Sequence, residues 1–288
     1  MTLAAAFILS WFLVGVWIKT LRSLGLGKEV RADGPESHLK KAGTPSMAGV
    51  PMALAAGAVA ALSGVIPAGV AGVALLFLLI GLLDDLLPKF ARRPLKAREK
   101  IVLQFLAGLA FALYGLPSPG YLPHPALDTL FVVLVVVGAA NAMNFTDGVD
   151  GLAASVGAIL LLPFVGEPLA AAAIGALLGF LWHNAPPARV FMGDAGSEAL
   201  GALIAAHWLA AGGGWYLALA AAVPIAELLS VVAQVLYFRA TGGKRILKMA
   251  PLHHHLELSG WSEAKIVFRF AALTAVSVAL AVALWRGL

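Results

Sequence analysis

Long hydrophobic runs separated by short polar segments make up most of the chain. A helix that crosses a membrane needs roughly 20 apolar residues, and the runs predict ten such helices. A count of nine stays open because Pro163 and Pro224 should interrupt their helices. The predicted spans lie near residues 2–21, 47–65, 67–83, 101–117, 126–143, 151–165, 168–183, 197–212, 215–238 and 266–286. We therefore expect an all-α, polytopic membrane protein that forms a single integral-membrane domain over residues 1–288.

The composition also points to a lipid environment. Apolar residues make up 61% of the 288 positions and charged residues 12%, with a mean hydropathy of +0.91, which exceeds what a water-soluble domain of this size could bury. The first run lacks a basic region before it and a small-residue cleavage site after it, which predicts a retained span rather than a signal peptide. The chain has no cysteine. Any metal must therefore be held by oxygen or imidazole ligands, which favours Mg²⁺ over Zn²⁺.

The basic residues predict how the chain is oriented in the membrane. Counted over the ten predicted spans, 19 of the 20 lysines and arginines fall on odd-numbered connections, and only Arg286 lies elsewhere. Short cytoplasmic loops retain Lys and Arg, so the odd connections are predicted to be cytoplasmic and both termini to lie on the other side. The same asymmetry explains the pI of 9.6 without any nucleic-acid partner.

Acidic residues gather on the same connections. Of the 15 acidic residues, 12 lie on or beside the odd-numbered connections, which predicts a polar site on one face of the membrane. Five segments supply this site, at residues 37–47, 81–100, 141–151, 183–197 and 250–261.

Three polar groupings in these segments are candidates for binding a metal or phosphate. Asp84 and Asp85 are predicted to end the third span, and Asp194 stands between glycines just before the eighth span, where a helix N-terminus favours anions. The third grouping combines a carboxamide and carboxylates with glycines that permit a tight turn: Asn144, Asp147, Gly148 and Asp150. Each grouping has a plainer explanation, namely a polar helix stop, an N-cap aspartate or an ordinary loop. Their occurrence on one face weakens those explanations.

Each of the other ionisable residues in the same region has two possible roles. His253, His254 and His255 are consecutive, so they cannot all face one way on a helix; they could donate to phosphate oxygens or, less consistently with the neighbouring residues, bind zinc. Lys100 could neutralise phosphate charge or only reflect topology. Glu227 lies at membrane depth, which makes it a functional candidate, with a structural hydrogen bond to a neighbouring helix as the equal alternative.

The polar segments together resemble the polyprenyl-phosphate N-acetylhexosamine-1-phosphate transferase superfamily, and within it the phospho-N-acetylmuramoyl-pentapeptide transferase branch. The similarity extends from about Ser37 to Phe270. It rests on the runs SHLKKAGTPSMAG, NFTDGVDGLA, FMGDAGS and APLHHHLELSGW. The last run is the most specific, because sister families carry a different histidine pattern there.

The resemblance implies a substrate pair, a cofactor and a set of site residues. The family transfers phospho-MurNAc-pentapeptide from UDP-MurNAc-pentapeptide to undecaprenyl phosphate, a membrane lipid, and produces lipid I and UMP for peptidoglycan synthesis. It further implies ten helices, a homodimer, Mg²⁺ dependence and a bacterial inner-membrane location with the active site on the cytoplasmic face. The catalytic residues implied are Asp84, Asp85, Asp194, Lys100, His254 and His255, with Asp194 as the metal ligand. The nucleotide- and substrate-binding residues implied are Lys41, Ser46, Asn144, Asp147, Gly148, Asp150, Asn184, Phe191 and His253.

The sequence departs from this family at two positions. Pro88 stands where a lysine usually follows the aspartate pair, and Lys89 is the candidate replacement. Ser46 stands where threonine is common, a change that keeps the hydroxyl group. In-line attack by the lipid phosphate is preferred, and a double displacement through a phospho-aspartate is the alternative.

Two rival functions make different predictions for the sequence. A membrane prenyltransferase would carry repeated Asp-x-x-x-Asp motifs, whereas residues 84–88 contain no third aspartate. A cation-coupled transporter would place polar residues near mid-membrane in several spans, and only Glu227 meets that expectation.

Overall fold

The computed structural model describes residues 1–287 apart from 26–42, 65, 91–92, 94 and 117–119. All regular structure in the described residues is helical, with no strand, which confirms the predicted all-α class. The helices are α1 (Thr2–Ser23), α3 (Gly49–Leu62), α4 (Ala68–Phe90), α5 (Ala97–Ala110), α6 (Pro125–Thr146), α7 (Leu152–Leu161), α8 (Pro168–Asn184), α9 (Gly193–Ala210), α10 (Gly214–Ala220), α11 (Ala222–Ala240), α12 (Leu252–Glu257) and α13 (Glu263–Arg286). A π-helix at Phe111–Gly115 extends α5, and a 3₁₀-helix at Leu162–Phe164 extends α7.

Several of these helices have the character of membrane spans. Among the described residues, α1, α4, α6, α11 and α13 are the five helices long and apolar enough to cross a bilayer. Shorter apolar helices are α3, α7 with its extension, and α8. The chain is therefore a membrane protein with several apolar helices, as the hydrophobic runs predicted.

The third predicted span extends further than expected. The sequence predicted an end at Asp84 and Asp85, but α4 continues through both residues to Phe90. Apolar Leu86 and Leu87 follow the pair, and the two carboxylates accept hydrogen bonds from α5 and α9. Because their charges have partners inside the protein, the aspartates do not need a solvated helix end.

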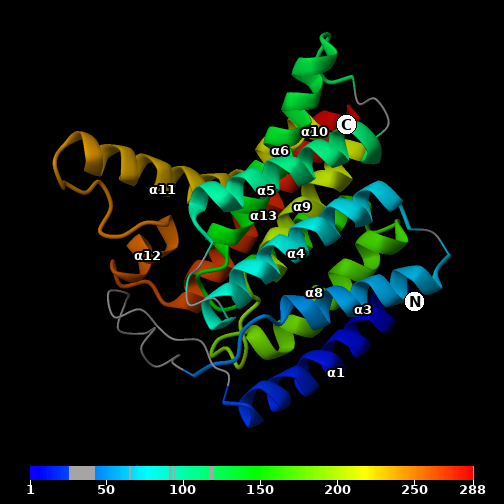
Figure 1. Ribbon diagram of the computed structural model, residues 1–288, viewed down its shortest axis with the longest axis horizontal. Coiled ribbons are helices and arrows are strands. Elements are labelled where there is room, and N and C mark those ends of the chain that lie inside the picture. The colour runs from blue at the N-terminus through cyan, green and yellow to red at the C-terminus, as the bar shows by residue number, and fades with distance from the viewer. Residues whose placement is uncertain (26–42, 65, 91–92, 94, 117–119, 288) are drawn as a thin grey trace.

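The ninth predicted span is divided near its proline, as expected. α10 ends at Ala220 and α11 begins at Ala222. Pro224 lies in the first turn of α11, where backbone N–H groups have no partner within the helix, so proline's missing N–H costs nothing there. Figure 1 shows α11 projecting away from the bundle, with α12 on the returning chain below it. Exposed apolar residues such as Leu229 and Leu236 cover α11, as expected for a helix that faces lipid.

The most deeply buried helix is α9. It packs against α4, α6 and α3, and most of its residues are buried. A Cβ atom at Gly81 of α4 would lie 2.3 Å from the main-chain oxygen of Asp194, so glycine is required for this close approach of the two backbones. The contact places Asp84 and Asp85 beside the start of α9.

The end of the bundle that contains α12 and the end of α4 lies opposite the chain termini. Figure 1 shows both termini on the right-hand side of the view, whereas α12 and the end of α4 lie toward the left. The two termini therefore lie on the same side of the bundle.

Candidate active site

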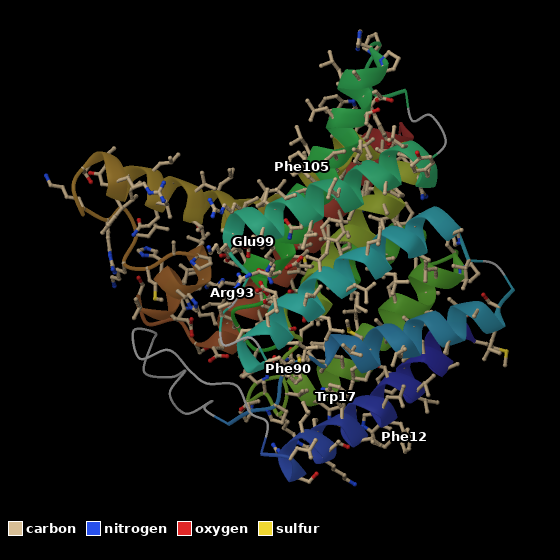
Figure 2. All side chains as sticks on the ribbon, viewed as in Figure 1. Phe12, Trp17, Phe90, Arg93, Glu99 and Phe105 are labelled. Atoms are coloured by element: carbon tan, nitrogen blue, oxygen red, sulfur yellow. The ribbon has the colours of Figure 1, made fainter. Side chains whose placement is uncertain are left out.

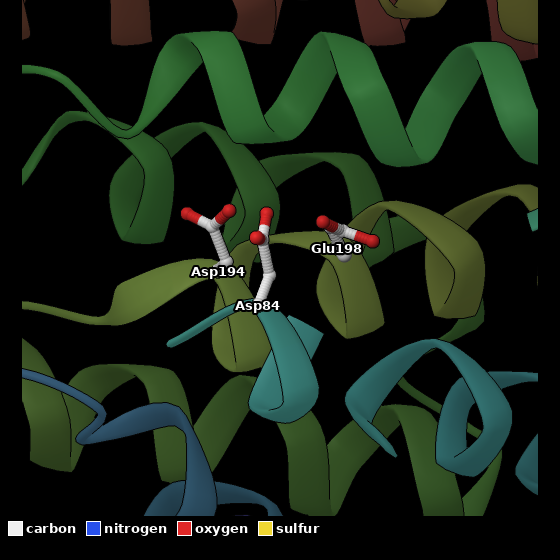
Figure 3. A group of neighbouring side chains, drawn as sticks. All are labelled: Asp84, Asp194 and Glu198. Carbon is white, nitrogen blue, oxygen red and sulfur yellow. The ribbon is translucent and has the colours of Figure 1, made fainter. Parts of the chain in front are cut away.

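Three carboxylates converge where α4 and α9 meet. Asp84 comes from α4, and Asp194 and Glu198 come from the first turns of α9. One oxygen from each carboxylate lies within 4.8 Å of an oxygen of each of the others, and Figure 3 shows the three side chains next to one another. Asp194 and Glu198 are four residues apart, so they lie on the same face of the helix. We call Asp84, Asp194 and Glu198 the acidic triad.

Lys100, in the first turn of α5, bridges all three members of the acidic triad. Its Nζ lies 2.8 Å from Asp84 Oδ2, 2.7 Å from Asp194 Oδ2 and 2.5 Å from Glu198 Oε1. Only 14% of the lysine side chain is exposed, so water screens these charges weakly. Three carboxyl groups thus converge on a single ammonium group, so the site has more acidic ligands than this one cationic side chain can pair.

The chain holds Lys100 in place through a capped helix start. Glu99 accepts a backbone hydrogen bond at the start of α5 at 3.0 Å and pairs with Arg93 at 3.0 Å. Figure 2 labels Arg93 and Glu99 at this corner. Asp84 Oδ1 also accepts the N–H of Leu95 at 3.2 Å. Because these side chains satisfy free amide groups at a helix N-terminus, α5 begins at a defined position beside α4.

Two side-chain amides support Glu198. Gln104 of α5 donates to Glu198 Oε2 at 2.9 Å, and Asn141 of α6 donates to Gln104 Oε1 at 2.7 Å. Both Glu198 and Gln104 have no exposed surface, and a buried acid is costly unless it is hydrogen-bonded. The sequence interpretation did not include either residue. The available signal for Glu198 was its position four residues after Asp194 in a largely apolar helix.

Asn144 and Asp85 position the start of α9. Asn144 Nδ2 donates to Asp194 Oδ1 at 3.1 Å and to Ser197 Oγ at 2.9 Å. Asp85 Oδ2 accepts the N–H of Ala195 at 3.1 Å, which satisfies a free amide of the first turn. Asp194 lies inside that turn rather than at the N-cap position, so its side chain is directed to the triad and not to capping.

Residues 147–151, which we call the nucleoside loop because the resemblance assigns Asp147, Gly148 and Asp150 to the nucleotide, lie against the segment before α9. Asn184 is buried, and its Oδ1 accepts the N–H of Gly151 at 2.9 Å. Asp150 Oδ2 accepts the N–H of Ala188 at 2.8 Å. The structure thus brings together two of the segments that the sequence assigned to one site.

Phe191 and Ser46 lie in two backbone segments that pair with each other. The N–H of Phe191 donates to the carbonyl of Pro45 at 2.9 Å, and the carbonyl of Phe191 accepts the N–H of Ala48 at 3.1 Å. The carbonyl of Ser46 accepts the indole N–H of Trp17 at 3.1 Å. The residue runs before α3 and before α9 therefore lie side by side.

α12 directs the three histidines to different partners. His253 is fully buried, and its Nδ1 lies 3.1 Å from Glu227 Oε2. His254 Nδ1 lies 2.7 Å from Glu257 Oε2, and His255 Nδ1 accepts a backbone N–H from the preceding loop at 3.1 Å. Within the described part of the chain, the group of three metal-ligating side chains contains carboxylates and no histidine.

Two residues expected at the site lie outside the described structure. They are Lys41 and the side chain of Lys89. Pro88 lies in the last turn of α4.

The fold and the site define an all-helical membrane protein whose polar centre is a lysine-bridged group of carboxylates. Sequence comparison narrows this class. Residues 67–212 match the family described as Glycosyl transferase family 4. The matched stretch contains the acidic triad, Lys100 and the nucleoside loop.

Curated relatives identify the family more closely, and they match almost the whole chain. The chain is similar to the phospho-N-acetylmuramoyl-pentapeptide-transferase of Deinococcus radiodurans, with 42% identity over 96% of this chain and 97% of the relative. Enzymes of the same name from Synechococcus sp. and Thermoanaerobacter sp. are 40% and 39% identical over 96% of this chain, covering 86% and 95% of the relatives. The chain therefore belongs to the phospho-N-acetylmuramoyl-pentapeptide-transferase family, whose members are glycosyl-1-phosphate transferases. This confirms the resemblance inferred from the motifs.

Proposed function

We propose that this enzyme transfers phospho-MurNAc-pentapeptide from UDP-MurNAc-pentapeptide to undecaprenyl phosphate and forms lipid I and UMP in peptidoglycan synthesis. The observation that carries the proposal is the acidic triad around Lys100. Asn144, which lies just before the nucleoside loop, donates a hydrogen bond to Asp194 of the triad and so connects the two. Membership of a family named for this transferase supplies the substrates. Both substrates carry phosphate groups, which need cationic partners in a partly dehydrated site.

The acidic triad suits Mg²⁺. This cation takes oxygen ligands, commonly one or two carboxylates together with waters and substrate phosphates, and the triad offers three carboxylates with oxygens within 4.8 Å of one another. Thiolate ligands do not exist in a chain without cysteine. We assign Asp194, with Asp84 and Glu198, as the residues that would hold the ion. When bound, Mg²⁺ would neutralise charge on the donor diphosphate.

The transfer exchanges one phosphorus–oxygen bond for another. An oxygen of the lipid phosphate attacks the donor phosphorus next to the sugar, and the bond from that phosphorus to the bridging oxygen breaks, so that UMP leaves with the bonding electrons. Lys100 offsets the negative charge that develops on UMP. The second pKa of a phosphate monoester is about 6, so the attacking group is already ionised near neutral pH and Asp84 positions it. A double displacement through a phospho-aspartate is the alternative route.

The other predicted residues are assigned to the substrates. We propose that His254 and His255 donate to phosphate or sugar oxygens of the donor, and that Asp85 maintains the start of α9. Phe191 is proposed to stack on uracil. The full set proposed for the nucleotide and the rest of the substrate is Lys41, Ser46, Asn144, Asp147, Gly148, Asp150, Asn184, Phe191 and His253, of which His253 has the more structural role.

The proposed membrane arrangement has ten crossings. It counts α10 and α11 as one crossing and includes the extensions of α5 and α7. Support comes from the two termini, which lie on the same side in Figure 1, as an even number requires. The basic connections then place the active site on the cytoplasmic face of the bacterial inner membrane. We also propose a single domain over residues 1–288 and a homodimer.

A labelled donor tests the proposed function. Purified protein with undecaprenyl phosphate, Mg²⁺ and UDP-MurNAc-pentapeptide labelled in the sugar should move the label into butanol-extractable lipid. A prenyltransferase or a transporter would leave the label in the aqueous phase, so that result would contradict the proposal.

A further inference from the structure

A buried acid on α11 holds the first histidine of α12. The side chains of Glu227 and His253 have no exposed surface. Glu227 Oε1 accepts the main-chain N–H of His253 at 3.1 Å, and Glu227 Oε2 lies 3.1 Å from His253 Nδ1. One carboxylate thus satisfies a free amide at the start of α12 and orients the ring.

The opposite edge of the His253 ring faces the nucleoside loop. A Cβ atom at Gly148 would lie 2.2 Å from His253 Nε2. Gly148 does not have a positive φ, so the ring, rather than the backbone conformation, is what excludes a side chain there. His253 Nε2 is buried and makes no hydrogen bond within the described structure. The ring therefore acts as a spacer that is held by Glu227 on one edge and supports Gly148 on the other.

The same ring contacts the next histidine. The ring centroids of His253 and His254 are 4.2 Å apart, at an interplanar angle of 69°. His254 is also held by Glu257, at 2.7 Å. A displacement of His253 would therefore alter both the support of Gly148 and the position of His254.

α11 supports the returning chain at a second point on the same face. Gln234 lies seven residues after Glu227, which is about two helical turns. Its Oε1 accepts the N–H groups of Ile246 and Leu247, each at 3.0 Å. Gln234 thus fixes to α11 the segment that precedes α12 in the sequence, and Glu227 fixes the start of α12 itself.

We propose that Glu227 is a positioning residue for the transfer reaction. Acting through His253, it aligns the nucleoside loop with His254, although it does not itself touch substrate. The inference rests on the proposed function, in which the loop binds the nucleotide and His254 donates to phosphate or sugar oxygens of the donor. It explains why an ionisable residue lies inside a largely apolar membrane helix.

Glu227→Gln is the first test, because it keeps the shape of the side chain and removes its charge. We expect kcat to fall roughly 10- to 100-fold, by analogy with the loss of partners that orient metal-ligating histidines. His253→Ala should give a similar loss, and the double variant should lose little more, because Glu227 acts through that ring. Losses that multiply in the double variant would overturn the proposal.

A control for the loss of an acid paired with a histidine exists at the start of α8. Glu167 forms a second Glu–His pair, with its Oε2 3.8 Å from His207 Nε2. Glu167→Gln should leave kcat unchanged. A loss equal to that of Glu227→Gln would show a general effect of removing an acid rather than positioning.

Hydrogen exchange provides a readout that does not depend on the reaction. Glu227→Gln should speed amide exchange in residues 147–151 and 252–257, and unchanged exchange there together with wild-type kcat would overturn the proposal.

If the Glu227 variants do not fold, Gly148→Ala tests the same contact. It should lower kcat in the native chain but cause no further loss of kcat when His253 is already replaced by alanine. An equal cost in both backgrounds would remove the ring from the contact. Failure of the native enzyme to transfer a sugar phosphate would instead reject the proposed function, while the exchange result would still decide the contact.

Discussion

At the scale of single residues, Asp194 connects most of the site. Its two oxygens bind Lys100 at 2.7 Å and Asn144 at 3.1 Å. Asp194→Asn keeps the size of the side chain and removes the charge proposed to hold Mg²⁺, so we expect turnover to fall by orders of magnitude while the protein still folds. Turnover and thermal unfolding measured on the same preparation check this. Near-normal turnover would remove Asp194 from the mechanism.

Asp128→Asn is the control for that substitution. Asp128 is a buried carboxylate that accepts the N–H groups of Gly120 and Leu122 at 3.1 and 3.0 Å, in the connection that precedes α6. Asparagine keeps one acceptor oxygen and presents an NH₂ group to the other backbone amide, so the substitution should lower the free energy of unfolding by about 1–3 kcal/mol. Turnover per folded molecule should stay unchanged.

Phe191 tests the nucleoside side of the site. Stacking of a base on an aromatic side chain contributes roughly 1 to 3 kcal/mol, so Phe191→Ala should weaken UMP and donor binding more than lipid binding. Phe12→Ala, on the exposed surface of α1, is the matched loss of an aromatic ring. Titration that shows unchanged UMP affinity for Phe191→Ala would favour a membrane-interface anchor instead.

The sequence predicted some of these residues more readily than others. Asp84, Asp194 and Lys100 stood out because they border apolar runs on one predicted face. Glu198 and Gln104 did not, because each lies within an apolar helix and only the packing of α5 against α6 and α9 shows their hydrogen bonds. Polar residues inside a helix reveal their partners only once the neighbouring helices are known.

At the scale of elements, α12 carries the next prediction. His254 and His255 lie on a short helix whose first histidine is buried, and neither belongs to the acidic triad. Alanine at either position should lower the rate with UDP-MurNAc-pentapeptide without unfolding the protein, and metal analysis should find Mg²⁺ dependence with no stoichiometric zinc. Zinc that copurifies one to one, and is lost when the triplet is changed, would make this loop a metal site.

Hydrophobic patterning predicted the existence of the helices better than their ends. Pro224 marked the division between α10 and α11 because proline is compatible with a first turn but not with a helix interior. The end of α4 was misplaced because Asp84 and Asp85 looked like a polar boundary. Charges that are paired across helices do not end a span, and pairing across helices cannot be read from one run of sequence.

At the scale of the whole molecule, the distribution of basic residues makes a topological prediction. With 19 of 20 lysines and arginines on odd-numbered connections, a reporter fused after Leu288 should behave as external, since it would follow the tenth crossing. Alkaline phosphatase and green fluorescent protein fusions at this position report the two sides separately. A cytoplasmic C-terminus would mean that the number of crossings is not ten or that the orientation is reversed.

The most direct measurement of the proposed reaction is UMP release from UDP-MurNAc-pentapeptide by the purified protein in detergent. UMP should appear only when undecaprenyl phosphate and Mg²⁺ are both present, and Asp194→Asn should abolish it. Release of UMP without the lipid acceptor would contradict direct attack by the lipid phosphate. No release in the complete mixture, from protein shown to be folded, would contradict the proposed function itself.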